Sequence, residues 1–399
     1  MKNTDKQINK IQSKIINIEN ELNRKFEERE EEIHGLTTSI LSDSNVLLLG
    51  KPGVAKSLLV KSWKDHIQSG NYFEYLLTRS SVPEELIGPV SLSKLKEDIY
   101  VKNTTGMLPE SNLAFIDEVF KGSSGTINIL LPILNERVFF NGGKFQKMDL
   151  LSLIGASNEL PETQDGLDAI VDRFILKYWV KDVTERGNFI NMMETYLNGE
   201  EKETTKISIS EIEKIKEHIN SIEVPKDILF SIFEIVSNLK RENIRVSGRT
   251  VNNSLRLIQA NAFLNEHDVV KEEDLRILQH AYWDEPEQKS KVKSIILEET
   301  NPSENELNKL LAKAEDIYED TKASSSKEEK DETDEAAKVV VTFKKLKQIA
   351  EKMSTIRKGM KERDKSTKHA SKMIRKVIKY GEEISENDIT VDFENLTNL

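Results

Sequence analysis

The chain has 399 residues, of which 37% are hydrophobic and 32% are charged, enough for the apolar cores of two or three domains. The absence of cysteine excludes disulfides and thiolate metal sites and makes the cytoplasm the expected location. No apolar run reaches the roughly 18 residues that span a bilayer, so no membrane insertion is expected, and the formal net charge of −11 disfavours a surface that binds nucleic acid throughout.

Residues 1–45 are predicted to form an N-terminal helical segment. Apolar residues recur in it at steps of three and four, with charged residues between them, at Ile8, Ile11, Ile15, Ile18 and Leu22. The first residues also lack the apolar core of a secretion signal.

Short apolar runs alternate with helical patterns between residues 46 and 183. The runs span 46–49, 73–77, 113–116, 151–154 and 175–180. This alternation predicts a parallel sheet with helices on both faces, and continuously apolar strands fit a sheet that is buried on both sides. We therefore predict an α/β domain over residues 46–183.

Strand patterns stop after this domain. Helical patterns follow at 209–219, 226–239, 250–264 and 272–282, and they predict a second, all-helical domain over residues 184–285.

The remaining residues, 286–399, form a charged extension. Residues 321–337 are acidic and of low complexity, and we predict a disordered linker there. Residues 338–380 hold 15 Lys or Arg against 3 acids and repeat apolar residues at close to a heptad, which predicts a basic helix. Two interpretations stay open, a docking arm for a partner and a helical hairpin whose charges neutralise one another. Nucleic-acid contact is disfavoured because no aromatic residues are interleaved.

The residues after the first apolar run have the pattern of a phosphate-binding loop. They are Gly50, Lys51, Pro52, Gly53, Val54, Ala55, Lys56, Ser57 and Leu58. Between a strand and a helix, the backbone N–H groups of such a loop point at phosphates, Lys56 would reach the β- and γ-phosphates of ATP, and Ser57 would ligate Mg²⁺. Ala55 stands where glycine is usual, and alanine is tolerated at this position if its φ stays negative. The alternative is an ordinary turn into a helix.

Polar side chains end two of the later apolar runs. Asp117 and Glu118 follow the run 113–116, at the strand end where open α/β sheets bind ligands. Asp117 would hold Mg²⁺ through water, and Glu118 would orient the attacking water. Asn158 follows the run 151–154 and could bond the γ-phosphate or that water, or it could cap the turn before Pro161.

Several motifs occur in the order found in one family. They are GKPGVAKS at 50–57, FIDE at 115–118, LNER at 134–137 and ASNELP at 156–161. On these motifs, residues 25–283 resemble the AAA+ ATPases of the MoxR family, in its RavA-like branch, where alanine marks the branch at position 55. The resemblance implies an AAA+ P-loop NTPase core with a parallel sheet and an all-helical lid, here followed by a helical, coiled-coil-like extension.

The resemblance also implies roles for single residues. Asn158 is similar to the sensor 1 residue, and the DRF motif at 172–174 makes Arg173 the finger that acts on ATP held by a neighbouring subunit. The SGR motif at 247–249 makes Arg249 the sensor 2 residue, reaching from the lid to the bound nucleotide.

Other positions stay more open. Thr250 replaces a second arginine of the branch, Arg256 is interpreted as an ordinary helix-surface charge, and Arg137 is the next candidate if Arg173 is not the finger. Residues 84–106 resemble a family insert, and residues 137–150 resemble a hairpin that either faces a ring pore or has no role.

The resemblance implies Mg²⁺-dependent ATP hydrolysis by a ring, expected to have six subunits, that remodels a protein partner, with a von Willebrand factor A protein as the expected kind of partner. An ATP-gated assembly switch with slow hydrolysis is the second hypothesis. A nucleic-acid motor is the third, supported only by the basic arm.

Overall fold

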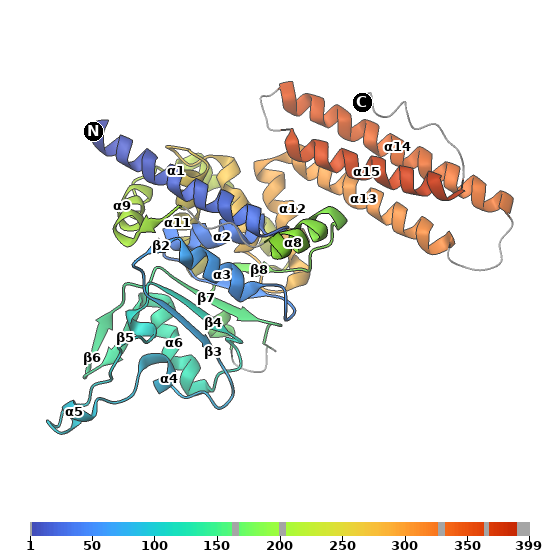
Figure 1. Cartoon of the computed structure of the whole chain (residues 1–399). Helices are drawn as coiled ribbons and strands as arrows, with labels where there is room; N and C mark the ends of the chain where they lie inside the picture. Colours follow the sequence, from blue (N-terminus) through green and yellow to red (C-terminus); the bar gives the residue numbers. More distant parts are fainter. Residues whose placement is uncertain (1, 162–166, 199–204, 326–331, 363–366, 389–399) are drawn as a thin grey trace. The chain divides into compact units, whose positions relative to one another are not determined.

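The computed structural model describes residues 2–161, 167–198, 205–325, 332–362 and 367–388 (Figure 1). It divides into two compact units, Met1–Lys293 and Ser294–Leu399, which are described one at a time. Among the described residues, no helix is both long and apolar enough to cross a membrane.

Five parallel strands form the centre of the first unit. They are β1 (Val46–Leu49), β3 (Tyr72–Leu76), β4 (Leu113–Asp117), β7 (Ser152–Ser157) and β8 (Leu176–Trp179), in the order β3-β4-β7-β1-β8. Every residue of β1 and β7 is buried, as the continuously apolar sequence of β1 and the apolar centre of β7 lead one to expect. The predicted parallel sheet is therefore confirmed.

Helices cover both faces of this sheet. The chain moves from β1 to the far strand β3 through α3 (Lys56–Asp65), and moves back from β4 to β7 through α6 (Ser124–Glu136). Because parallel crossovers are right-handed, opposite directions of travel place these two helices on opposite faces, as Figure 1 shows.

The insert and the hairpin lie between these elements. The insert contains the short helices α4 (Glu84–Ile87) and α5 (Leu92–Leu95), with η1 (Leu108–Glu110) after it. Strands β5 (Val138–Asn141) and β6 (Lys144–Lys147) pair antiparallel through Gly142 and Gly143, whose φ values of 59° and 78° are those of a tight hairpin turn. Phe140 is exposed on the hairpin and meets Phe145 edge to face, with ring centroids 5.5 Å apart.

Residues 1–45 form two helices, α1 (Lys2–Lys25) and α2 (Glu30–Leu41). The predicted apolar stripe of α1 is buried, because α1 packs on α2 and on the helices α9 and α11 of the following region. Polar contacts support this packing: Lys14 Nζ lies 2.6 Å from Glu211, and Gln12 donates to the carbonyl of Phe263 at 2.6 Å.

A helical region follows the sheet. Its elements are α8 (Arg186–Asn198), α9 (Ile209–Ile219), α10 (Lys226–Arg241), α11 (Gly248–Leu264), η3 (Glu272–His280) and η4 (Pro286–Gln288), whereas the short helix α7 (Asp168–Val171) lies between β7 and β8. The two-residue strands β2 (Ile67–Gln68) and β9 (Ile207–Ser208) pair beside it. Ser247 caps α11 by accepting a hydrogen bond from Thr250 N at 3.1 Å. The predicted helices are present, although the last is a 3₁₀ helix.

The second unit is a bundle of α13 (Pro302–Ser325), α14 (Glu332–Glu362) and α15 (Lys368–Asp388), preceded by α12 (Lys289–Thr300), which crosses the boundary between the units. The apolar stripe predicted along the basic helix, including Leu346, Ala350 and Met353, is the core of this bundle. Basic side chains pair across it, with Lys352 3.3 Å from Glu306 and Lys376 2.8 Å from Glu315. These contacts favour the helical-hairpin interpretation.

Helices occupy both ends of the predicted linker. Residues 321–325 belong to α13 and residues 332–337 to α14, whereas residues 326–331 lie outside the described part of the chain. The disorder predicted for 321–337 is therefore wrong at its two ends.

The bundle core should carry the stability of the second unit. Met353 is fully buried, and Met353→Ala is expected to lower the free energy of unfolding by about 2–5 kcal/mol, because a cavity replaces its side chain. Val341→Ala, at a 51% exposed side chain, is the control. Thermal unfolding followed by circular dichroism checks this, and equal transitions for the two variants would contradict the assigned core.

Candidate active site at two edges of the sheet

The loop between β1 and α3 is shaped by two glycines. A Cβ on Gly50 would lie 2.3 Å from the carbonyl oxygen of Val180, and the backbone of Gly53 has φ of +89°. Gly50 N also donates to the carbonyl of Ser157 at 3.1 Å. The loop is therefore held against the ends of β7 and β8, and its turn needs glycine at both positions.

Ala55 corrects one expectation. Its φ of 64° and ψ of 27° are left-handed, so the condition of a negative φ under which alanine is easily tolerated is not met. This conformation costs an L-residue about 1–2 kcal/mol. The cost is offset by its position as the N-cap of α3, where the Ala55 carbonyl accepts from Leu59 N at 3.0 Å. Alanine thus adopts the conformation that glycine would supply.

Lys56 folds back over the loop. Its ammonium group donates to the carbonyl of Gly50, to the carbonyl of Lys51 at 3.2 Å and to Asn158 Oδ1 at 3.4 Å. Burial lowers the pKa of Lys56, while the charges of Asp117 and Glu118 act in the opposite direction. The loop therefore holds a buried cation against its own backbone carbonyls, where a phosphate would bind.

Glu118 and Asn158 contact each other at the ends of β4 and β7. Asn158 Nδ2 donates to Glu118 Oε1 at 2.7 Å, and Lys121 Nζ lies 3.2 Å from the same oxygen. Because Asn158 also accepts from Lys56, one amide links the lysine of the loop to the acid of β4. The sequence left open whether Asn158 only caps a turn; its side chain lies between the two candidate catalytic groups.

A triphosphate with Mg²⁺ fits this donor set. The described residues contain no cluster of three or more His, Asp or Glu side chains that would hold a metal alone. Mg²⁺ does not need one, since it is usually bound by one or two carboxylates together with substrate phosphates. Asp117, at the end of β4, and Ser57, in the first turn of α3, are the side chains that would hold it.

Arg173 lies at the opposite edge of the sheet. It precedes β8, and its carbonyl accepts from the side chain of Asn45, which precedes β1, at 3.1 Å. From Asn45 to Gly50 the extended chain covers about 16 Å. Arg173 therefore stands at the amino ends of the strands and cannot reach a phosphate bound by the loop of its own chain.

Arg249 lies beside Arg173. Its guanidinium is 3.8 Å from Asp172 and donates to Asn135 Oδ1 at 3.4 Å, while Arg173 is 3.9 Å from the same carboxylate. Burial, and then the charge of Arg249, lower the pKa of Arg173. The sequence led us to expect Arg249 at the bound nucleotide. In the structure Arg249 does not lie at the loop of its own chain and instead lies beside Arg173, the predicted finger.

The two arginines line a polar cavity of about 560 Å³. Arg256 lines it too, seven residues after Arg249 on α11, which is two helical turns along the same face. The sequence interpretation of Arg256 as an ordinary surface charge missed this location, although the spacing from Arg249 was a usable signal.

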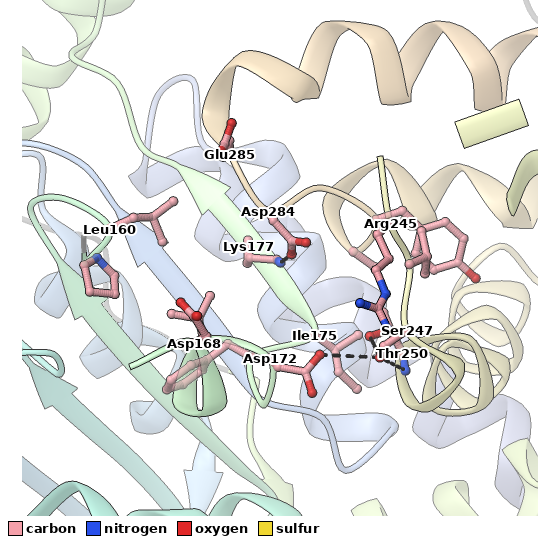
Figure 2. A pocket seen from close by; sticks show the side chains of 16 residues that line it. Leu160, Asp168, Asp172, Ile175, Lys177, Arg245, Ser247, Thr250, Asp284 and Glu285 are labelled. Atoms are coloured by element: carbon pink, nitrogen blue, oxygen red, sulfur yellow. Dashed lines mark hydrogen bonds and ion pairs between the residues drawn. The ribbon is translucent and has the colours of Figure 1, made fainter. Parts of the chain in front are cut away.

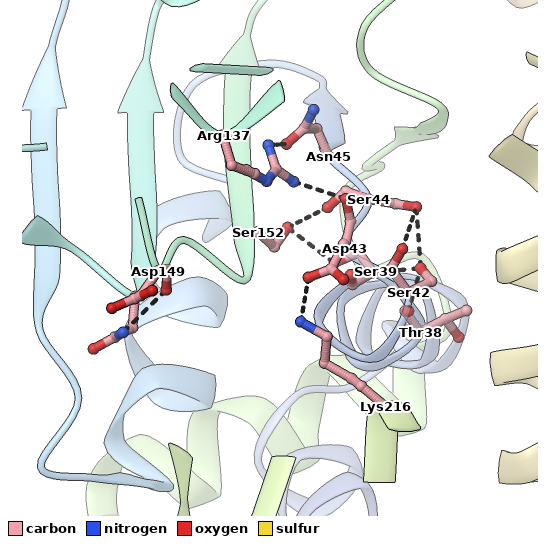
Figure 3. A network of polar contacts seen from close by, with 11 residues as sticks. Thr38, Ser39, Ser42, Asp43, Ser44, Asn45, Arg137, Asp149, Ser152 and Lys216 are labelled. Atoms are coloured by element: carbon pink, nitrogen blue, oxygen red, sulfur yellow. Dashed lines mark hydrogen bonds and ion pairs between the residues drawn. The ribbon is translucent and has the colours of Figure 1, made fainter. Parts of the chain in front are cut away.

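Arg137 has a structural role instead. Its guanidinium donates to Asn45 Oδ1 at 2.7 Å, to the carbonyl of Asp43 at 2.8 Å and to the carbonyl of Leu134 at 3.2 Å (Figure 3). Burial lowers its pKa to about 10, against the opposing charge of Asp43. These bonds tie the end of α6 to the turn before β1, so Arg137 is not a free candidate for the finger.

Asp172 also faces a second cavity, of about 440 Å³, between β8 and α11. There Ser247 Oγ donates to Asp172 at 3.4 Å, and the buried Lys177 pairs with Asp284 at 2.9 Å (Figure 2). One oxygen of the Asp172 carboxylate therefore accepts from Ser247, and the other lies near both Arg249 and Arg173.

Comparison with known proteins agrees with this geometry. Residues 13–221 match the family described as the MoxR domain in the MoxR-vWA-beta-propeller ternary systems, and residues 227–296 match an AAA lid domain. The first match covers more than half of the chain, so the chain belongs to the MoxR family of AAA+ ATPases. The RavA-like branch stays a prediction.

Relatives and a solved structure extend the comparison. Two uncharacterised proteins of Methanocaldococcus jannaschii, MJ0079 and MJ0812, are each 40% identical, over 74% and 71% of this chain and 76% and 75% of their own lengths. Chaperone MoxR1 of Mycobacterium tuberculosis is 27% identical over 36% of this chain and 38% of its own. A crystal structure from Cytophaga hutchinsonii, 22% identical with a TM-score of 0.61, covers 75% of this chain and 98% of its own and shows the same fold.

The contact between Glu118 and Asn158 leads to a first test at the site. Glu118→Gln is expected to lower ATP turnover by at least about 10²-fold, because it removes the carboxylate that orients water while leaving the loop and Asp117 intact. Lys94→Ala, which removes only the exposed ion pair with Glu97 beside α5, is the control and should leave turnover unchanged. Wild-type turnover by Glu118→Gln would exclude Glu118 as the general base.

Proposed function

We propose that this chain hydrolyses ATP with Mg²⁺ at sites shared between neighbouring subunits of a ring, and that it uses the cycle to remodel a protein partner. One observation supports this most directly. Lys56, Glu118 and Asn158 contact one another at the carboxyl ends of the strands, whereas Arg173 and Arg249 lie at the amino ends. A complete site with an arginine finger therefore needs two copies of the chain.

Each residue has a defined task in this proposal. The loop and Lys56 bind the phosphates, while Ser57 and Asp117 would hold Mg²⁺, which neutralises developing charge on the phosphoryl oxygens. Glu118 orients the attacking water and Asn158 positions Glu118 through their 2.7 Å hydrogen bond. Arg173 and Arg249 of the next subunit stabilise the charge on the transferring phosphoryl group, an effect worth about 10³–10⁵ in rate for such fingers.

The partner is proposed from the comparisons. The matching family is described as part of systems that also contain a vWA protein, and one relative is named a chaperone. We therefore infer a partner with a von Willebrand factor A domain and a ring of six subunits, as in related ATPases. The cytoplasmic location stays a prediction from the sequence.

An ATP-gated assembly switch is the second candidate. The hydrogen bond from Asn158 occupies an oxygen of Glu118, so the acid must leave this contact before it can act fully on water. A slow release would make the chain a binding switch with little turnover. Stimulation of steady turnover by the partner favours the motor, and its absence favours the switch. For a nucleic-acid motor, the charge pairing within the bundle of α13, α14 and α15 offers no support.

Subunit mixing tests the shared site. Arg173→Ala subunits are expected to bind ATP through their own Lys56 but to hydrolyse it at least about 10³-fold more slowly. Lys56→Ala subunits are expected not to bind ATP. In a mixed ring, a Lys56→Ala subunit presents an intact Arg173 to ATP held by an Arg173→Ala neighbour. Turnover should therefore show a maximum at intermediate ratios of the two variants.

The control for this titration replaces the Lys56→Ala protein, which supplies the intact Arg173, with the double variant Lys56→Ala, Arg173→Ala. It supplies neither group, so its mixture with Arg173→Ala should remain inactive. Activity in the control, or none in the test mixture despite demonstrated mixed assembly, would overturn the shared site.

A further inference from the structure

Helix α8 has an exposed apolar face. Six of its large apolar side chains are between 39% and 87% exposed: Phe189, Ile190, Met192, Met193, Tyr196 and Leu197. At about 100° per residue these six fall within an arc of about 160°, so they share one side of the helix. No described side chain of α8 is buried.

The polar face of α8 is the one that contacts the rest of its unit. Glu28 accepts from Glu185 N at 2.9 Å and from Asn188 Nδ2 at 3.0 Å, and Asn191 Nδ2 donates to Glu27 at 3.3 Å. Amphipathic surface helices normally turn the apolar side inward. α8 has 13 residues, a length at which a helix without tertiary contacts is marginal in water, so cover on its apolar side would stabilise it further.

The position of α8 indicates what that partner is. The helix begins six residues after Val180, whose carbonyl oxygen lies against Gly50 of the phosphate loop. It therefore leaves the sheet at the carboxyl edge, the edge to which the proposed function brings the Arg173 of a second subunit.

The same chain offers a second unpartnered apolar face, on α10. Leu229, Phe230 and Phe233 are 43%, 69% and 64% exposed there, while Ile232 and Ile235 on the other side of α10 are buried. Two different apolar patches on one chain are what a head-to-tail contact between identical subunits requires.

We infer that the apolar face of α8 docks on the exposed face of α10 in a second copy of the chain, and that this contact repeats head to tail around the assembly. The inference rests on the proposed function, because a shared site brings a neighbour to this edge. It adds the residues that hold the two subunits together.

The experiment measures ATP-dependent assembly by analytical ultracentrifugation, in a Glu118→Gln background that keeps ATP bound. Tyr196→Glu with Leu197→Glu alters α8 at side chains that are 87% and 80% exposed, and Phe230→Glu with Phe233→Glu alters α10. Each pair should leave the monomer folded, as circular dichroism would show, and should weaken assembly at least about 100-fold. Leu92→Glu, at a side chain 74% exposed on α5, is the control that should assemble normally.

Mixing the two altered proteins gives the sharper result. The intact α8 of the α10 variant can dock on the intact α10 of the α8 variant. A third subunit cannot be added at either end of this pair, because each end carries an altered helix. The mixture should therefore form dimers of one subunit of each kind and nothing larger.

The outcomes separate this inference from the proposed function. If the Glu118→Gln protein itself does not assemble with ATP, the shared site fails. If it assembles and the α8 variant assembles equally well, only the docking of α8 fails. A third outcome is that the α8 variant assembles poorly, the α10 variant assembles as well as the parent protein, and the mixture assembles no better than the α8 variant alone. In that case α10 is not the surface on which α8 docks, and that part of the inference is overturned.

Discussion

The geometry of a parallel sheet is the constraint on which the rest of this molecule depends. All five strands run in the same direction, so everything that follows a strand gathers at one edge and everything that precedes a strand gathers at the other. The loop of Lys56 and the acid Glu118 follow strands, whereas Arg173 precedes one. A buried strand cannot shorten or bend to bring these groups together, so chemistry that needs both requires a second chain.

Asp172 connects the amino ends of the strands to the helical region. It contacts Ser247 and Arg249 at the start of α11 and lies next to Arg173 before β8. The N-terminal helices add further ties, since His34 bridges Glu19 on α1 at 3.2 Å and Asn261 on α11 at 2.7 Å. A movement of α11 would therefore carry Arg249 with it and change the charge balance at Arg173, which gives the helical region a physical route to the reaction.

The sequence predicted the parts of the site that are local. The strand ends, the loop, the acids of β4 and the amide of β7 follow from apolar periodicity and from the position of polar residues after each run, and the structure brings Lys56, Glu118 and Asn158 together. The conformation of Ala55 could not be predicted, because contacts of the loop with Ser157 and Val180, more than 100 residues away in the chain, hold it. The location of Arg249 was missed for the same reason: its partners Asn135 and Asp172 belong to other elements.

Helix α8 shows a different limit of sequence reasoning. Its pattern of apolar residues defines a face, but a pattern cannot say whether that face meets the core of the same chain or another molecule. The structure shows that this face is turned away from the first unit, because Glu27 and Glu28 hold the polar side of α8. The helix is anchored by its polar side and follows the end of β8, where Val180 lies against Gly50 of the phosphate loop, so a neighbour that covers its apolar side would link assembly to the nucleotide site.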